Sequence, residues 1–179
     1  MSGTRQAATQ TAKEVALQNV TMPSNPASQS RAGVASASGT RYAAAPVLNQ
    51  LQVPGGVAQV RQQLLDARRN DPQAQLWPEV AGDIIGEDYQ RAGDVKNAIE
   101  LFKLNLLAYP NSADAHYNLA DAYLADSQKD LVRQYAEKAL ALLDSHAAPL
   151  SSWSATAERR AEIRQGIQDT LKKLAEGSR

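Results

Sequence analysis

The stretch LNLLAYPNSADAHYNLADAYL, residues 104–124, decides how the chain folds, because it places a stop signal between two apolar runs of helical spacing. Pro110 cannot continue a helix, and Ser112 is a residue type that caps the first turn of the next one. The stretch therefore predicts one helix that closes near Tyr109 and another that opens at Ala113. It is either a buried hairpin of an enzyme or a seam between two repeats that hold a partner.

The same helical spacing continues on both sides of this stretch. Apolar residues recur every three or four positions in six segments, at 57–70, 78–93, 94–109, 112–126, 129–144 and about 154–176. Pro78 suits the first turn of a helix, and Gly93 suits a helix end. Valine-rich alternating runs between turn residues, which would indicate strands, do not occur. The sequence predicts an all-α fold of about six helices.

Two of the helical pairs repeat with a period of 34 residues and need no gap. Ile85 then aligns with Leu119, and Tyr89 aligns with Tyr123. The first copy has a large apolar residue, a glycine, a tyrosine, an alanine, an aromatic residue and a closing proline, at Ile85, Gly86, Tyr89, Ala98, Phe102 and Pro110. The second copy departs from this set at Ala120, Val132 and Ala136. Small residues let two helices approach closely, and the aromatic side chains fill the space beside them.

These positions resemble the tetratricopeptide repeat, whose unit is a helix, a turn and a second helix in 34 residues. The resemblance implies antiparallel helical hairpins stacked as a short right-handed array. The helical domain is expected at 56–176, with a capping helix at 57–72, repeats at 79–112 and 113–146, and a C-terminal capping helix at 154–176. Because about three repeats are normally needed for stability, the flanking helices are expected to cover the exposed ends.

Residues 1–55 differ in character from the rest of the chain. They are rich in Ala, Ser, Gln, Thr and Gly, with too few large apolar side chains to offset the entropy of ordering. Four basic residues oppose Glu14 alone, a net charge of +3, which leaves 15 basic and 18 acidic residues, a net charge of −3, in the remainder. The composition predicts a flexible, positively charged tail.

A narrower resemblance covers residues 57–174. The run AIELFKLNLLAYPNSADAHYNLADAYL is similar to the C-terminal repeat tail of some bacterial serine hydrolases of the β-lactamase-related and esterase types. Asn105, where the repeat family more often has alanine, fits that tail. The resemblance brings no catalytic domain with it, so it implies an accessory or oligomerising segment associated with such a hydrolase.

Motifs for catalysis and metal binding are absent from the sequence. Neither G-x-S-x-G nor S-x-x-K occurs, and no phosphate-binding glycine loop is found. The chain has no cysteine and two histidines, and neither His116 nor His146 lies in a metal-ligand spacing. His116 is interpreted as a packing or surface residue, and His146 as a residue beyond a helix end. We expect a chain that is not an enzyme and needs no metal or cofactor.

The resemblance implies that the first helix of each repeat lines a concave, partner-binding surface. The family's surface positions correspond here to Val80, Asp83, Glu87, Gln90, Arg91, Asp114, Tyr117, Asp121, Leu124 and Ala125. Asn118 matches one asparagine of the clamp that grips a terminal carboxylate in some members, but the clamp's basic residues are missing. Four carboxylates against Arg91 predict an acidic face that favours a basic or neutral peptide, the chain's own N-terminal tail included.

The expected function is therefore an adaptor or scaffold that binds a protein or peptide. The alternatives are the hydrolase-associated segment and a homo-oligomer formed by end-to-end stacking. A balance of 19 basic and 19 acidic residues gives no overall attraction to nucleic acid. No run reaches the ~20 apolar residues of a membrane span, and no secretory signal is visible, so a cytoplasmic location is expected.

Overall fold

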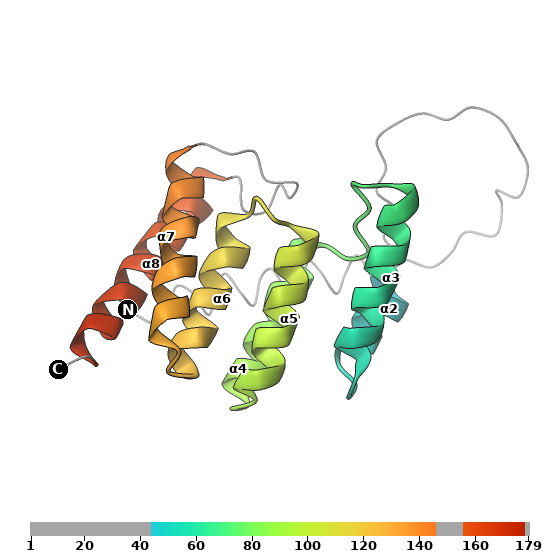
Figure 1. The fold of residues 1–179 in the computed structure, drawn as a ribbon, viewed down its shortest axis with the longest axis horizontal. Coiled ribbons are helices and arrows are strands. Elements are labelled where there is room, and N and C mark those ends of the chain that lie inside the picture. The colour runs from blue at the N-terminus through green and yellow to red at the C-terminus, as the bar shows by residue number, and fades with distance from the viewer. Residues whose placement is uncertain (1–43, 146–155, 178–179) are drawn as a thin grey trace, which may run out of the picture.

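A computed structural model describes residues 44–145 and 156–177, and these residues fold into seven α-helices with no strand among them (Figure 1). The helices are α2 (Ala44–Leu51), α3 (Gly56–Asn70), α4 (Glu79–Arg91), α5 (Val95–Ala108), α6 (Ala113–Ala125), α7 (Lys129–Asp144) and α8 (Ala157–Glu176). The predicted all-α fold is confirmed. Within the described ranges, no helix combines the length and the apolar character that crossing a membrane requires.

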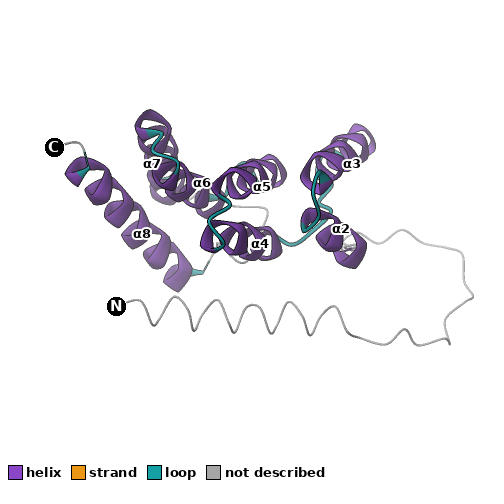
Figure 2. Cartoon of the chain, turned by 90° about the horizontal axis from the view of Figure 1, so that it is seen from below, coloured by secondary structure: helices purple, strands orange, loops and turns teal. Residues whose placement is uncertain are grey.

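The helices are arranged as three antiparallel hairpins that lie side by side and are followed by one further helix. α2 pairs with α3, α4 with α5, and α6 with α7, while α8 packs against both α6 and α7 (Figures 1 and 2). Seen from below, the first helices of the hairpins line one side of the row, and α8 slants across the last hairpin (Figure 2). The expected array of stacked helical hairpins is therefore present.

Local signals in the sequence set the boundaries of the central helices. The Ser112 hydroxyl accepts a hydrogen bond from the Ala115 amide at 3.1 Å, as expected for a residue that caps α6. Asp94 caps α5 in the same way through the Asn97 amide. Gly93 lies between α4 and α5 at φ 83°, a left-handed conformation that side chains disfavour. The predicted turns therefore lie where the sequence placed them.

The first hairpin corrects the expectation that residues up to 55 form a flexible tail. Residues 44–51 form α2, and its side chains Val47 and Leu51 are buried against α3. The Tyr89 hydroxyl of α4 also donates a hydrogen bond to the Leu51 carbonyl at 3.1 Å. An eight-residue helix is marginal in isolation, so α2 owes its stability to these contacts, which the local sequence does not reveal. Residues 1–43 lie outside the described residues.

The first hairpin is joined to the second by an arginine as well as by apolar contacts. The Arg68 guanidinium of α3 donates hydrogen bonds to the carbonyls of Leu107 at 2.6 Å and Ala108 at 2.8 Å, at the end of α5. These carbonyls belong to the last turn, where the helix offers them no N–H donors of its own and its dipole favours a cation. The predicted single capping helix at 57–72 is thus one half of a hairpin fastened to α5.

Close helix contacts explain why the two repeats differ. An added Cβ on Gly86 of α4 would lie 2.3 Å from Cε1 of Phe102 in α5, so glycine is required beside this ring. In the second repeat the equivalent residues are Ala120 and Ala136, both fully buried. The larger residue on α6 is therefore accompanied by a smaller one on α7, and the two substitutions compensate in volume.

Candidate functional site

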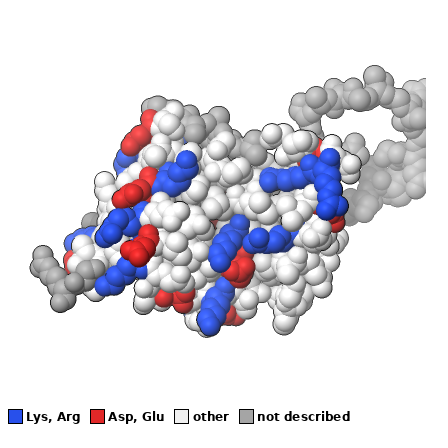
Figure 3. All heavy atoms as spheres, in the orientation of Figure 1, with Lys and Arg blue, Asp and Glu red and all other residues white. Residues whose placement is uncertain are grey.

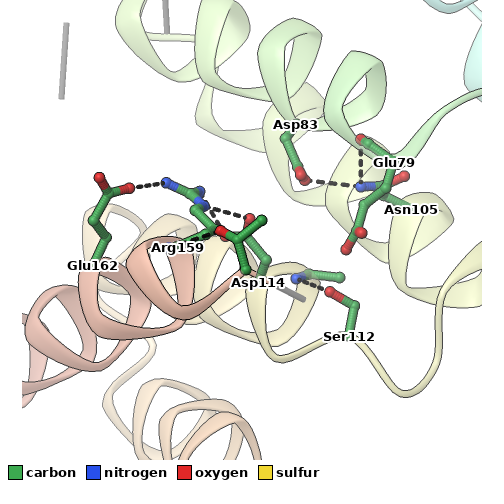
Figure 4. A network of polar contacts seen from close by, with 9 residues as sticks. Glu79, Asp83, Asn105, Ser112, Asp114, Arg159 and Glu162 are labelled. Atoms are coloured by element: carbon green, nitrogen blue, oxygen red, sulfur yellow. Dashed lines mark hydrogen bonds and ion pairs between the residues drawn. The ribbon is translucent and has the colours of Figure 1, made fainter. Parts of the chain in front are cut away.

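The expected partner-binding residues lie where α4, α6 and α8 meet. We call the surface of α4 and α6 on this side the covered face, made of Asp83, Asp114, Tyr117, Asn118 and Asp121. Figure 4 shows the part of this face at Asp83 and Asp114, with α8 presenting Arg159 to Asp114 and Asp83 lying across from this pair on α4. Asp114 and Arg159 are 45 positions apart in the chain.

An ion pair fastens the first turn of α8 to α6. The Arg159 guanidinium donates two hydrogen bonds to the Asp114 carboxylate, at 2.9 Å and 2.8 Å, and a third to Glu162 at 3.1 Å. Asp114 is fully buried, and the Arg159 side chain is 13% exposed. Burial by itself would lower the pKa of Arg159, but the charge and hydrogen bonds of Asp114 raise it, so the guanidinium stays charged.

A buried asparagine organises the α4 side of the covered face. The Asn105 amide of α5 donates to Asp83 Oδ1 at 2.8 Å and to the Glu79 carbonyl at 3.2 Å, while its oxygen accepts from Trp77 Nε1 at 2.9 Å. Gly82 makes this approach possible, because an added Cβ there would lie 2.5 Å from the Asn105 oxygen. Every polar atom of the Asn105 side chain is therefore used, and Asp83 is held in one orientation.

Asp83 is a buried carboxyl group whose surroundings favour its neutral form. Burial raises its pKa well above the usual value, and the nearby Asp114 and Glu79 carboxylates raise it further. Arg159 and the Asn118 amide lower the pKa but do not reverse the shift. Neither Asp83 Oδ2 nor Asn118 Nδ2 makes a hydrogen bond of normal geometry. A protonated Asp83 is favoured in the folded chain, since burying its charge without a full partner is costly.

Further along α6, α8 covers an aromatic side chain and a second carboxylate. The Tyr117 ring lies against Gly166 of α8, where an added Cβ would be 2.5 Å from Cζ. Asp121 accepts hydrogen bonds from Gln90 Nε2 at 3.0 Å and from Thr170 Oγ1 at 3.3 Å. Ile163 and Ile167 join the apolar cluster around Tyr117. Residues along one side of α8 thus contact the covered face along its length.

The structure brings predicted site residues together but buries four of them. Four residues expected on an exposed surface are at most 4% exposed, namely Asp83, Asp114, Tyr117 and Asn118. The expectation of an open face at Asp114–Tyr117–Asp121 is therefore wrong, because α8 lies over α6. Of the other candidates, Val80, Glu87, Gln90, Asp121 and Leu124 are half-buried, and Arg91 and Ala125 are exposed.

Sequence reasoning missed the residue of α8 that pairs with Asp114 in this surface. Arg159 is not among the residues expected at the site, yet it forms the ion pair with Asp114. The signal available was an arginine in the first turn of a helix, where the helix dipole disfavours a cation and a specific partner is needed. Position alone could not name Asp114 as that partner.

His116 is a packing residue, in agreement with one of its two predicted roles. It is 7% exposed, its Nε2 lies 3.2 Å from the Pro110 carbonyl, and its ring is 5.9 Å from that of Tyr135. Burial lowers its pKa, which favours the neutral ring. His146 lies outside the described residues. In the described part of the chain, no three His, Cys, Asp or Glu side chains form a group that could hold a metal ion.

Charge on the opposite side of the molecule is mixed. On the face drawn in Figure 3, basic and acidic side chains are interspersed over α5 and α7 and separated by uncharged surface.

Comparison with models of known families gives no match, and none of the curated proteins searched matches the sequence significantly.

Proposed function

We propose that this chain is a non-catalytic protein-interaction module, an adaptor or scaffold of the tetratricopeptide-repeat type that binds a helix or peptide of a partner protein. The observation that carries the proposal is the covered face itself, which already accepts a helix. Arg159 pairs with Asp114, Gly166 lies against Tyr117, and Thr170 bonds to Asp121. A surface that binds α8 through an ion pair, an apolar stripe and a close helix contact has the chemistry of helix recognition in general.

The accessible edge of this surface lies on α4 and the end of α6. Glu87, Gln90 and Asp121 are half-buried, and Arg91 is exposed beside Asp88, with which it forms an ion pair. Exposed ion pairs of this kind contribute little to stability. A charge change at Arg91 should therefore leave the fold largely intact, whereas Glu87 is half-buried and the folding of its variant is checked by circular dichroism.

The test is a cross-linking capture with charge-reversed variants of the full chain. Glu87→Lys should reduce capture of a basic partner by about tenfold, since repulsion replaces attraction at the edge of the face, whereas Arg91→Glu removes a like charge and should maintain or increase capture. Arg133→Glu, an equally exposed change on α7, is the matched control and should capture as wild type does. Equal capture by all four chains would show that binding does not use this face. Recovery of a serine hydrolase would favour the accessory-segment alternative.

Self-association is a second candidate, favoured by exposed apolar side chains on the first hairpin. Val53 and Leu65 are 51% and 41% exposed, the largest apolar exposures among the described residues. If this end stacks on another copy, sedimentation should depend on protein concentration, and Leu65→Glu should abolish that dependence. A single species at all concentrations would exclude this candidate.

A further inference from the structure

We propose that His116 makes the packing of α6 against α7 sensitive to acid, because a proton taken up on its Nδ1 finds no acceptor in the described part of the folded chain. The inference goes beyond the proposed function, since it concerns the pH range in which the module keeps its packing and not the partner that it binds. His116 lies near the start of α6, directly after the turn that joins the two central hairpins.

The contact of Nε2 fixes the His116 ring in one tautomer. Nε2 lies 3.2 Å from the Pro110 carbonyl oxygen. Because a carbonyl only accepts, Nε2 carries the hydrogen and donates it, and Nδ1 is the bare nitrogen at which a further proton binds. Among the described residues Nδ1 has no hydrogen-bond partner, although His116 is only 7% exposed. Protonation would therefore create a buried N–H donor without an acceptor, which is costly.

The groups around the ring do not compensate a positive charge. From α7, the Tyr135 ring lies 5.9 Å away and the Lys138 ammonium acts on His116 as a like charge. Among the described residues, no carboxylate is found among the groups that act on the ring. Burial has the largest effect on the pKa of His116 and lowers it, Lys138 lowers it further, and the Pro110 carbonyl opposes both only in part.

The contacts that a proton would disturb are those that join α6 to α7. Tyr135 of α7 lies against two rings of α6, because it also stacks on Tyr123 with ring centroids 5.5 Å apart. His116 and Tyr123 are seven residues apart, so they lie two turns apart on the same side of α6. A charged His116 ring gains hydration only by turning away from Tyr135 and Pro110. Acid therefore weakens the packing at this seam.

The lowered pKa of His116 sets the direction of the pH dependence. The unfolded chain takes up the proton near the ordinary pKa of 6.5, and the folded chain takes it up at a lower pH. The contribution of the neutral ring to stability is therefore complete above the ordinary pKa and is lost as the pH falls. Asp83 has the opposite effect because its pKa is raised, so its contribution to stability is lost as the pH rises.

The experiment compares urea unfolding of full-length wild type and His116→Gln at about pH 7.5 and about pH 5.5. Glutamine is the matched variant, because its amide N–H can replace Nε2–H at the Pro110 carbonyl but takes up no proton in this range. His146 and the carboxylates are present in both chains, so their titration cancels in the comparison.

On acidification, the ratio of unfolded to folded chain should rise at least about threefold more in wild type than in His116→Gln, and at most about tenfold more for each pH unit, since one proton is involved. Hydrogen exchange in α6 and α7 should show the same excess acceleration in wild type. An equal rise in both chains, or no excess acceleration in these two helices, would overturn the inference.

Lys138→Gln provides a second test that leaves the buried ring in place. Lys138 is exposed, and removing its charge should raise the pKa of His116 and reduce the acid sensitivity. Lys172→Gln, an equally exposed change on α8, is the matched control and should behave as wild type. Should His116→Gln prove unfolded by circular dichroism, an NMR titration of the wild-type ring decides. A His116 pKa at or above the ordinary value would then refute acid sensing.

Discussion

Removing Arg159 should destabilise the fold more than any other single surface-proximal charge change, because Asp114 would then be buried without a cation. Asp114 is fully buried, and the arginine makes two hydrogen bonds to it at 2.9 Å and 2.8 Å. Leaving one member of a buried ion pair without its partner lowers the free energy of unfolding by about 3–5 kcal/mol. We expect a loss of this size for Arg159→Gln.

The contribution of Glu162 is the internal reference for this value. Glu162 is bound by the same guanidinium at 3.1 Å, but its side chain is 52% exposed. An exposed ion pair is worth about 0–1 kcal/mol, so Glu162→Gln should change stability by less than about 1 kcal/mol. The expected losses of stability for Arg159→Gln and Glu162→Gln thus differ severalfold, because Asp114 is buried and Glu162 is exposed.

The assay is urea unfolding of the full chain, followed by circular dichroism at 222 nm. The single variants Arg159→Gln and Asp114→Asn are compared with the double variant, which removes both charges and restores neutral hydrogen bonding. The double variant should be less destabilised than the sum of the two single variants by about 2 kcal/mol or more. A loss below about 1 kcal/mol for Arg159→Gln, or strict additivity, would refute the reasoning.

Three further predictions follow from single contacts. Asp83→Asn should raise the free energy of unfolding at pH 7 by about 1–3 kcal/mol. Because the pKa of Asp83 is raised in the folded chain, its contribution to stability is fully present below the unfolded pKa and is lost as the pH rises. Urea unfolding near pH 4 should therefore show almost no gain for the variant, and an equal gain at both pH values would contradict this. Gly86→Ala should cost about 1–3 kcal/mol by overpacking against Phe102, and a double-mutant cycle with Phe102→Ala should show the cost relieved. Arg68→Met should lower the thermal midpoint by several degrees through loss of the α5 carbonyl contacts, whereas Arg69→Met, at a side chain 74% exposed, should leave it unchanged.

The sequence predicted the features that depend on near neighbours in the chain. Ser112 caps α6 through an amide three residues away, and Gly93 turns the chain within its own hairpin. The 34-residue register identified the two central hairpins, because Tyr89 and Tyr123 occupy equivalent places on α4 and α6. Caps, turns and the repeat register depend only on residues within one repeat of the sequence. The positions and order of the helices could therefore be predicted.

Features that depend on distant partners could not be predicted in this way. α2 contains few large side chains, and its burial requires contacts with α3 and α4. The covered face was assigned to solvent because Asp114 and Asp83 lie outside the apolar stripe, but Arg159 arrives from 45 residues further on. A charged residue on a helix can be exposed to solvent or buried in an ion pair, and the sequence of its own helix does not show which of the two occurs.

The compensating residues Gly86 with Phe102 and Ala120 with Ala136 also define which pieces of this chain can be exchanged. Each pair is matched within its own hairpin, so a complete hairpin transplanted into a chimera carries its packing solution with it. A crossover placed between the two helices of a hairpin would instead set alanine against phenylalanine in one product and glycine against alanine in the other. The first product would be overfilled and the second would contain a void. The hairpin is therefore the smallest unit that recombination or duplication can move without repacking its interior.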